Sequence, residues 1–203
     1  ISTPDHWHVP MSLLAIRAGK DVICEKPTLT IAEGRKLSET VSRYGRVFQT
    51  STEDRSLRVY HRMAELVRNG RLGKLHTIQV GVPYDFAFPN QPTQPVPEGL
   101  DYDLWLGPAP WAPYTYQRCR PWTQKESYSI WYHIADYCLG GIGGYWGVHH
   151  VDIGQWGHGT DDTGPVEIEG TGVFPADGLT DCATSWKVTH TYADGVKMIY
   201  MDE

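Results

Sequence analysis

The sequence lacks several features that would each mark a particular class of protein. It contains no Cys-x-x-Cys pair, which excludes zinc knuckles and thioredoxin-like redox motifs. We interpret its four cysteines, Cys24, Cys119, Cys138 and Cys182, as reduced thiols. No window approaches the ~18 consecutive apolar residues that a membrane-spanning helix needs, and the start shows no signal-peptide pattern. The formal net charge is −6, and no run of Lys or Arg exceeds two residues. We therefore expect neither a membrane segment nor a nucleic-acid partner.

The chain also lacks an initiating methionine, because it begins with Ile1. It stops just after a predicted hairpin, so we expect it to be a piece of a longer protein. Any export signal would precede Ile1, which leaves the localisation unknown, either cytoplasmic or periplasmic. The 203 residues, 40% hydrophobic and 21% charged, suffice for one large domain or two small ones.

Aromatic residues, in contrast, are abundant, with eight Trp and twelve Tyr. Several of them lie in proline-rich loops, which is typical of a pocket that stacks on flat or ring-shaped ligands. Ordinary packing is the alternative, and we accept it for most of them.

Helix and strand patterns alternate in the first 50 residues. Residues 10–18 place apolar side chains at helical spacing, with Pro10 at the first helical position. A short buried strand follows at 22–24. A Thr-x-x-Glu capping box at Thr30 opens a second helix, and residues 46–50 have the pattern of another strand. Strands and helices that alternate over short connections predict βαβ units with a parallel sheet.

The pattern changes in the rest of the chain. Residues 56–69 carry an apolar face at helical spacing, residues 74–84 alternate like a strand, and residues 85–125 are rich in proline and read as loop. Three further strands are predicted, at 166–175, 183–192 and 196–201. The last two are joined across Ala-Asp-Gly, a good hairpin turn. Strands in hairpins after a parallel unit predict a second, α+β domain with an antiparallel sheet.

The stretch YWGVHHVDIGQW, residues 145–156, concentrates groups that can carry chemistry. On a helix, Tyr145, His149, Asp152 and Trp156 would form one stripe. A phenol, an imidazole and a carboxylate are costly to bury unless they bond one another or face a wet pocket. Three interpretations are open: a satisfied structural network, an acid/base site, or a metal site.

A second candidate is Glu25-Lys26-Pro27, which follows the predicted strand at 22–24. The carboxyl ends of parallel strands are where open α/β sheets place their ligands. A lysine at this edge can bind a substrate hydroxyl and stabilise negative charge that develops on it. The alternative is a solvated lysine at the end of a strand.

The combination of motifs resembles a known family. STPDHWH followed by a helix, then GKDVICEKP, and later Gly147-x-His149-x-x-Asp152, is similar to the glucose-fructose oxidoreductase / inositol dehydrogenase / rhizopine catabolism (Gfo/Idh/MocA) family of NAD(P)-dependent oxidoreductases. The resemblance runs through essentially the whole chain and includes WLGPAP and GPVEIEG. It implies the C-terminal part of a Rossmann-type parallel sheet domain at 1–53, followed at 54–203 by an incomplete α+β domain with an open antiparallel sheet.

The resemblance also implies an activity and a set of site residues. The activity is hydride transfer between a sugar or polyol carbon and NAD or NADP, with Lys26 between nicotinamide and substrate and His149 taking the hydroxyl proton. The residues expected to line the cofactor are Thr3, Pro4, His8, Glu25, Lys26 and Pro27. The residues expected in catalysis are Lys26, His149, Tyr145 and Asp152, and those expected at the substrate are His150 and Arg55. His150 has packing as an equal alternative. Family members commonly form homo-oligomers through the open face of the antiparallel sheet.

This sequence departs from the family pattern at Tyr145, where inositol dehydrogenase-like members carry Asp. A tyrosine can hydrogen-bond, but it brings no negative charge at pH 7. Either Asp152 orients His149 instead, or the proton chemistry differs, or Tyr145 itself contacts the substrate.

A second departure concerns the cofactor's phosphates. A Rossmann domain opens with G-x-G-x-x-G after its first strand, and this sequence contains no such match. We therefore expect weak or no NAD binding by the isolated 203 residues. The choice between NAD and NADP is not predicted, because no residue that reads the ribose is identified.

Two other classes of function are compatible with the sequence. A metal-dependent hydrolase or isomerase would use as ligands His6, His8, His149, His150 and Asp152, but it would leave Lys26 without a role. A non-catalytic binding protein on the same fold would explain Tyr145 and the missing phosphate loop. It predicts that ligand affinity is unchanged when Lys26 or His149 is replaced.

Overall fold

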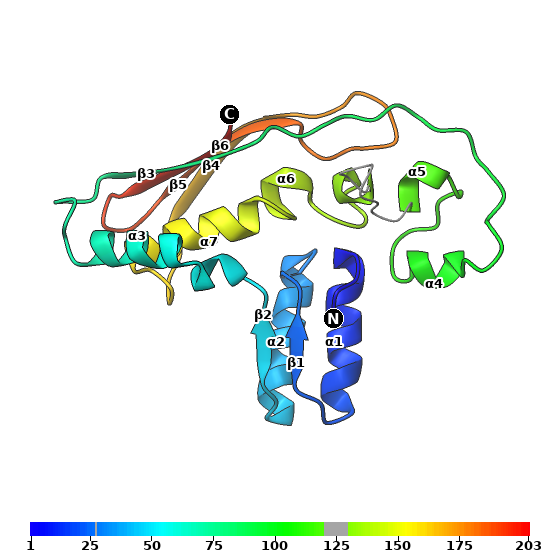
Figure 1. Ribbon diagram of the computed structural model, residues 1–203, viewed down its shortest axis with the longest axis horizontal. Coiled ribbons are helices and arrows are strands. Elements are labelled where there is room, and N and C mark those ends of the chain that lie inside the picture. The colour runs from blue at the N-terminus through cyan, green and yellow to red at the C-terminus, as the bar shows by residue number, and fades with distance from the viewer. Residues whose placement is uncertain (27, 120–129) are drawn as a thin grey trace. The chain divides into compact units, whose positions relative to one another are not determined.

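The computed structural model describes residues 1–26, 28–119 and 130–203 (Figure 1). By contacts the chain forms two compact units. The first consists of Ile1–Ser51, Phe86–Gly140 and Pro175–Cys182, and the second of Thr52–Asp85, Gly141–Phe174 and Ala183–Glu203. The boundary that we predict from sequence, after residue 53, separates the two domains of the family pattern and stays a prediction. The contacts add that residues 86–140 and 175–182 pack with the N-terminal segment.

The first unit begins with alternating helices and strands. A 3-10 turn, η1 (Asp5–Trp7), leads into α1 (His8–Arg17), and β1 (Val22–Cys24), α2 (Ile31–Tyr44) and β2 (Phe48–Thr50) follow. β1 and β2 pair in parallel, with Val22 opposite Phe48. Buried apolar residues of α1, β1 and α2 form the core between these elements: Val9, Ile16, Val22, Cys24 and Leu37. The predicted βαβ pattern is confirmed.

The ends of these helices follow local chemistry. The capping box at α2 is confirmed, because the Glu33 amide donates to Thr30 Oγ1 (3.2 Å) while the Thr30 amide donates to Glu33 Oε2 (3.1 Å). Our placement of Pro10 at the first position of α1 is wrong, because the helix begins two residues earlier, at His8. Proline is tolerated there because the amides of the first helical turn have no partner within the helix.

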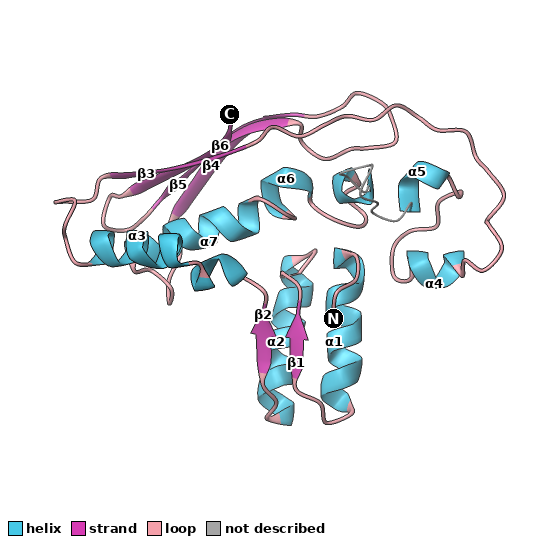
Figure 2. Cartoon of the chain, viewed as in Figure 1, coloured by secondary structure: helices cyan, strands magenta, loops and turns pink. Residues whose placement is uncertain are grey.

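The rest of the first unit consists of short helices joined by loops (Figure 2). It contains α4 (Tyr102–Leu106), α5 (Tyr116–Cys119) and the 3-10 helix η3 (Ile130–His133). Asp101 caps α4 by accepting a hydrogen bond from the Leu104 amide at 2.8 Å, so this part of the predicted loop is helical. The aromatic side chains pack on one another, as where Trp105 meets Tyr137 at 4.9 Å between ring centroids. Packing therefore explains many of the aromatics.

The second unit is a sheet with helices on one face (Figure 1). Its strands are β3 (Thr77–Val82), β4 (Glu167–Val173), β5 (Ser185–Thr191) and β6 (Lys197–Asp202), and its helical elements are η2 (Glu53–Ser56), α3 (Arg58–Arg68) and α7 (Gly147–His158). A further short helix, α6 (Gly140–Gly143), precedes α7. The strand order is β3-β6-β5-β4. The predicted hairpin of β5 and β6 is confirmed, whereas β3 runs parallel to β6, so the sheet is mixed and not wholly antiparallel.

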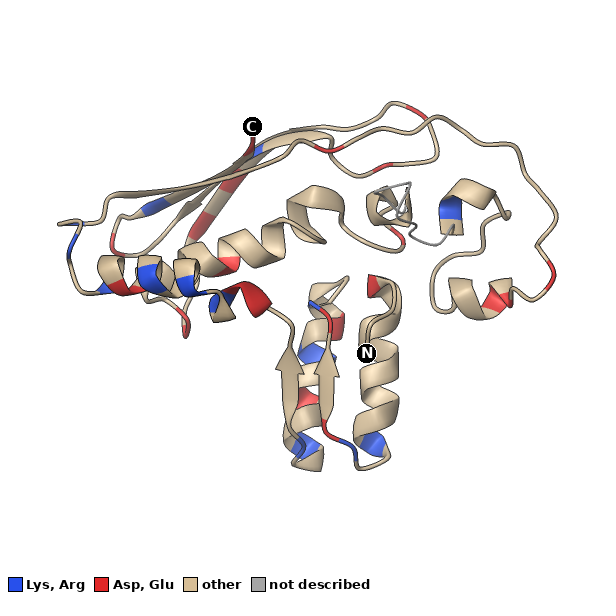
Figure 3. Cartoon of the chain, viewed as in Figure 1, with Lys and Arg blue, Asp and Glu red and all other residues tan. Residues whose placement is uncertain are grey.

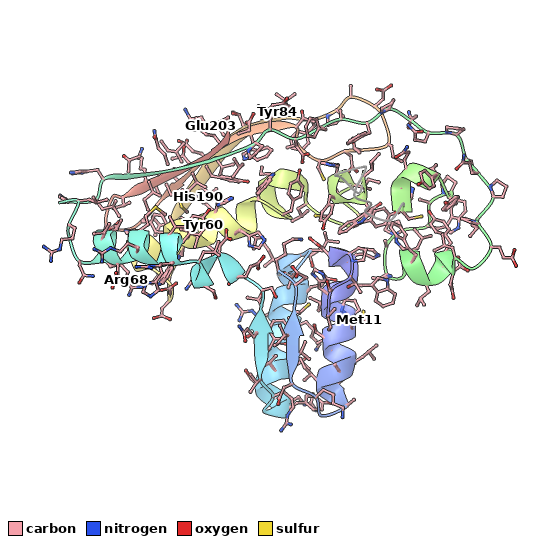
Figure 4. The ribbon with its side chains drawn as sticks, viewed as in Figure 1. Met11, Tyr60, Arg68, Tyr84, His190 and Glu203 are labelled. Carbon is pink, nitrogen blue, oxygen red and sulfur yellow. The ribbon has the colours of Figure 1, made fainter. Side chains whose placement is uncertain are left out.

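The register assigns the two faces of this sheet. Ile168, His190 and Met198 lie side by side on the face toward α7, and Val188 and Tyr200 share that face. Figure 4 labels His190 on this face. The opposite face carries polar and charged side chains, such as Glu169, Thr189 and Lys187, together with Ile199 and Met201. No helix among the described residues is both long and apolar enough to cross a membrane.

Candidate active site

Lys26 lies two residues after the end of β1 and is buried, with 6% of its surface exposed. Its Nζ lies 3.0 Å from Oδ1 and 3.2 Å from Oδ2 of Asp5, which is 3% exposed. The ammonium also lies 5.6 Å from the centre of the Tyr132 ring. Burial alone would lower the pKa of Lys26, but the charge of Asp5 outweighs it, and the pKa is raised. The alternative of a solvated lysine at the end of a strand is therefore wrong.

His8 joins the two segments that we expect along the cofactor. Its Nδ1 lies 2.9 Å from the carbonyl oxygen of Lys26, and its Nε2 lies 2.8 Å from the carbonyl oxygen of Thr3. The ring is 2% exposed. His8 thus contributes to this site through the two backbone segments that it connects. Glu25 is half-buried, and its amide donates to the carbonyl of Ile1. Pro27 lies outside the described residues.

In the second unit, Tyr145 lies in the turn before α7 and not on the helix. Its hydroxyl donates to Oδ1 of Asp85 at 2.8 Å, and Oδ2 of Asp85 accepts from the Gly141 amide at 2.8 Å. Asp85 is 4% exposed. The continuous stripe that we predicted from Tyr145 onward is wrong at its first member. Tyr145 instead meets a buried carboxylate from the end of β3.

Asp152 has its own partner. Arg55 donates to both carboxylate oxygens of Asp152, from Nε at 2.6 Å and from Nη2 at 2.7 Å, and Nη2 also donates to Asp161 at 2.8 Å. No hydrogen bond joins Asp152 to His149 within the described part of the chain. The alternative in which Asp152 orients His149 therefore does not hold. Asp152 raises the pKa of Arg55 by hydrogen bonding, against the opposite effect of burial. Two of the guanidinium nitrogens thus bind carboxylates, and a substrate contact by Arg55 stays a prediction.

His149 and His150 each face an acidic residue of η2. His149 Nδ1 lies 3.9 Å from Glu53 Oε2, and His150 Nδ1 lies 4.0 Å from Asp54 Oδ2. Among the described residues, His149 Nδ1 is buried without a hydrogen-bond partner. These two contacts link the imidazoles of α7 to the segment before α3.

The two histidines differ in their surroundings. The ring of His150 stacks on Trp146 at 5.8 Å and meets the edge of Tyr60 at 6.3 Å. Burial lowers the pKa of His150, although Asp54 opposes it. His150 is therefore packed as a neutral ring, which favours the packing alternative. Figure 3 shows how few charged residues α7 carries beside α3.

A pocket of about 690 Å³ lies beside α7 in the same unit. Val148, Val151 and Gln155 of α7 line one side, and His190 and Met198 of the sheet line the other. Asp152 also lines this pocket, whereas His149 is not among its lining residues and faces Glu53 of η2. In the described residues no group of three or more His, Cys, Asp or Glu is placed to hold a metal ion, and the metal interpretation has no structural support.

Sequence reasoning missed four acidic residues at these sites: Asp5, Asp85, Glu53 and Asp54. Asp5 lies inside the STPDHWH motif, between Pro4 and His8, which we expect at the cofactor, and a buried lysine requires a partner. That requirement is the one signal that could have identified Asp5. Asp85 lies about 60 residues before Tyr145, and nothing in the local pattern connects them.

Comparison with known proteins gives these sites a family context. Residues 60–203 match the oxidoreductase family, C-terminal alpha/beta domain, of the Gfo/Idh/MocA group, and residues 1–52 match its NAD-binding Rossmann fold. A 1,5-anhydro-D-fructose reductase of Ensifer adhaerens is 33% identical over 36% of this chain and 22% of its own length. The D-xylose 1-dehydrogenase (NADP(+)) of Hypocrea jecorina is 28% identical over 64% of this chain and 36% of its own.

A solved structure shows the same fold. The WlbA dehydrogenase from Bordetella pertussis, in complex with NADH and UDP-GlcNAcA, superposes with a TM-score of 0.68 at 15% identity. The match covers 98% of this chain and 50% of that one. The chain thus spans about half of this neighbour, and its matches span about a fifth to a third of the curated relatives. With both domain signatures in order along one chain, the protein belongs to the Gfo/Idh/MocA oxidoreductase family.

Proposed function

We propose that the protein containing this chain transfers a hydride between NAD(P) and a hydroxyl-bearing carbon of a sugar or polyol. Family membership supports this, and so do relatives named as a sugar dehydrogenase and a sugar-derivative reductase. The observation that carries the proposal is a buried, charged lysine, Lys26, at the carboxyl end of a parallel strand in the Rossmann segment. Burying a charged lysine costs free energy. A lysine that binds a substrate oxygen away from water has a reason to be buried, because its charge then acts more strongly on that oxygen.

The residues present fit the end of the cofactor at which hydride transfer occurs. Lys26 is held at the strand edge where doubly wound sheets bind nucleotides, and His8 fixes the backbone on both sides of that edge. The chain contains no G-x-G-x-x-G for the pyrophosphate. When bound, the cofactor supplies the hydride acceptor or donor, and the side chains described here act on the substrate hydroxyl.

Lys26 would bind the oxygen of the reacting carbon. An ammonium has three N–H donors, and the carboxylate of Asp5 engages at most two of them. The remaining donor can point at a substrate oxygen and stabilise negative charge as the O–H proton leaves. The raised pKa of Lys26 favours its role as a donor, because the group stays protonated at neutral pH.

His149 would accept the hydroxyl proton. An imidazole nitrogen can accept a proton, and His149 Nδ1 lies 3.9 Å from Glu53 Oε2. Tyr145 would contact the substrate while its hydroxyl donates a hydrogen bond to Asp85. Asp85 thus places a carboxylate near the position where inositol dehydrogenase-like members carry Asp. Asp152 would act indirectly, by fixing α7 to Arg55.

We also propose that the protein is a homo-oligomer that assembles through the outer face of the mixed sheet. This face exposes acidic residues on β4, such as Glu169, and basic residues on β5 and β6, such as Lys187 and Lys197. Two copies related by a two-fold axis would bring opposite charges together.

Kinetics of the full-length gene product test the proposed activity. A panel of sugars and polyols is incubated with NAD⁺ and with NADP⁺, and nicotinamide reduction is followed by absorbance. We expect turnover with one class of substrate, and a fall in kcat/KM of at least about hundredfold in Lys26→Met and in His149→Asn. The exposed Lys20→Met is the matched control and should leave kcat/KM unchanged.

Two outcomes would contradict this proposal. A folded protein that binds neither NADH nor NADPH, as measured by nicotinamide fluorescence, has no hydride chemistry of this kind. Normal turnover in both Lys26→Met and His149→Asn would remove the two residues from the mechanism. In the first case the non-catalytic binding protein would be the better interpretation.

A further inference from the structure

We propose that Asp5 is a positioning residue that fixes the Lys26 ammonium and keeps it charged, so that Lys26 serves as a hydrogen-bond donor and not as a proton acceptor. The catalytic role of this pair rests on the proposed function. The pairing of Asp5 with Lys26 rests only on the geometry of the first unit. The relevant segment is Thr3–His8, defined here as the TPDHWH segment.

The TPDHWH segment holds Lys26 at two points. Asp5 takes the ammonium with both carboxylate oxygens, at 3.0 and 3.2 Å, while His8 Nδ1 lies 2.9 Å from the Lys26 carbonyl oxygen. The main chain and the head group of one lysine are therefore fixed by two residues three positions apart. Lys26 cannot move its ammonium away from Asp5 without exposing a buried carboxylate to an apolar interior, which is costly.

Asp5 itself is rigidly placed. It is the first residue of η1, which runs directly into α1. The neighbouring His6 is anchored on the far side, where its Nε2 lies 3.0 Å from the Trp105 carbonyl oxygen and its amide donates to the Tyr137 carbonyl at 3.3 Å. The ring of His6 also packs 5.1 Å from that of Tyr137. The carboxylate is thus presented from a fixed backbone.

Among the described residues, three titratable groups raise the pKa of Lys26: Asp5, Cys138 and Tyr132. Burial raises the pKa of both the Tyr132 phenol and the Cys138 thiol, so both are neutral near pH 7. Asp5 is then the group of the three that carries a charge. Burial opposes the charged form of Lys26 and Asp5 restores it. Removing the charge of Asp5 would leave burial as the dominant influence on Lys26.

The pairing divides the catalytic labour. A buried lysine without a partner can lose its proton near neutrality and act as a base. Paired with Asp5, Lys26 retains its proton and can only donate, so the proton released by the substrate hydroxyl must go to another group. Because Asp5 keeps Lys26 protonated, another residue must act as the general base, and we propose His149 for this role.

Competitive labelling of the full-length gene product tests the pairing without any activity assay. Amines are acetylated with trace acetic anhydride over a range of pH, and the extent at each lysine is read by mass spectrometry. The exposed Lys20 and Lys36 are internal standards. Relative to Lys20, we expect labelling of Lys26 near pH 8 to increase about tenfold in Asp5→Asn, since one pKa unit changes the free amine tenfold. Asp5→Glu should retain most of the protection.

The unsubstituted chain decides the matter if Asp5→Asn does not fold by circular dichroism. In that chain the labelling of Lys26 should rise at higher pH than that of Lys20 and Lys36. A Lys26 that labels at lower pH than Lys20 would overturn the proposal. So would a folded Asp5→Asn chain in which the labelling of Lys26 is unchanged.

The pH profile of the full-length enzyme tests the catalytic meaning. In Asp5→Asn, kcat/KM should fall on the alkaline side, at a pH where the unsubstituted enzyme keeps its activity, because Lys26 loses its donor proton. If labelling shows the pairing but the enzyme has no nicotinamide-dependent turnover, the pairing stands and the proposed function fails. If Lys26→Met abolishes turnover but the labelling of Lys26 is the same in Asp5→Asn as in the unsubstituted protein, the proposed function stands and the positioning role fails.

Discussion

Asp85 shows how a single buried carboxylate can be recruited from a distant part of the sequence. It lies just after β3, and it accepts hydrogen bonds from the Tyr145 hydroxyl and from the Gly141 amide. At the position of Tyr145 the family resemblance leads one to expect Asp. The carboxylate is present nearby, but it enters from another strand end and reaches the site through a phenol.

This arrangement gives a prediction at the residue scale. Tyr145→Phe should lower the free energy of unfolding by about 1 kcal/mol, since one hydrogen bond is lost. Asp85→Ala should cost about 1–3 kcal/mol, because the Gly141 amide is then buried without an acceptor. Urea unfolding of both single variants and the double variant measures the coupling between them. Strictly additive effects would contradict a direct bond between the two side chains.

Some of these residues could be predicted from sequence and others could not. Lys26 and His149 stand in short motifs with recognisable neighbours, so both were candidates at once. Asp5 and Asp85 owe their roles to contacts across 21 and 60 residues, which no local periodicity encodes. The predicted position of Tyr145 is wrong because α7 begins at Gly147, two residues after the start of the predicted helical stripe.

At the scale of elements, the sequence predicts correctly those features that depend only on residues close to one another in the chain. The capping box of α2 and the hairpin turn between β5 and β6 involve residues close in sequence, and both are found in the structure. The direction of β3 relative to β6, in contrast, cannot be predicted from local sequence. The alternating pattern of a strand shows which residues share a face, but not which strand lies beside it or in what direction.

The outer face of the sheet carries the prediction at this scale. Lys187 lies on β5 opposite Thr171 of β4 and is exposed. If the full-length protein assembles through this face, Lys187→Glu should shift it toward the monomer, because like charges would meet across the two-fold axis. Light scattering after size exclusion measures the mass. Lys187→Arg is the control and should keep the oligomer, and an unchanged mass in Lys187→Glu would place the contact elsewhere.

For the whole molecule, one buried histidine, His6, and two partly buried ones, His150 and His190, link stability to pH. Burial lowers the pKa of His6, His150 and His190 in the folded chain. Such groups take up protons on unfolding, so their full stabilisation is present above the unfolded pKa of about 6.5 and is lost as the pH falls below it.

We therefore expect the midpoint of thermal unfolding to drop between about pH 7.5 and about pH 5.5. Scanning calorimetry at several pH values measures it. His190→Gln should flatten this dependence, whereas the exposed His76→Gln should leave it as it is. A midpoint that stays constant over this range in the unsubstituted chain would contradict the prediction.

The parallel pairing of β3 with β6 also determines when the second unit can form. Thr77 pairs with Lys197, so β3 is synthesised long before its partner strand. At roughly 5–20 residues per second, a ribosome needs on the order of ten seconds to make the 119 residues between Thr77 and Lys197. During that interval β3 has no neighbour in the four-strand sheet. The nascent chain then exposes Val80 and Val82, which are buried in the folded protein, on a strand that has no partner yet.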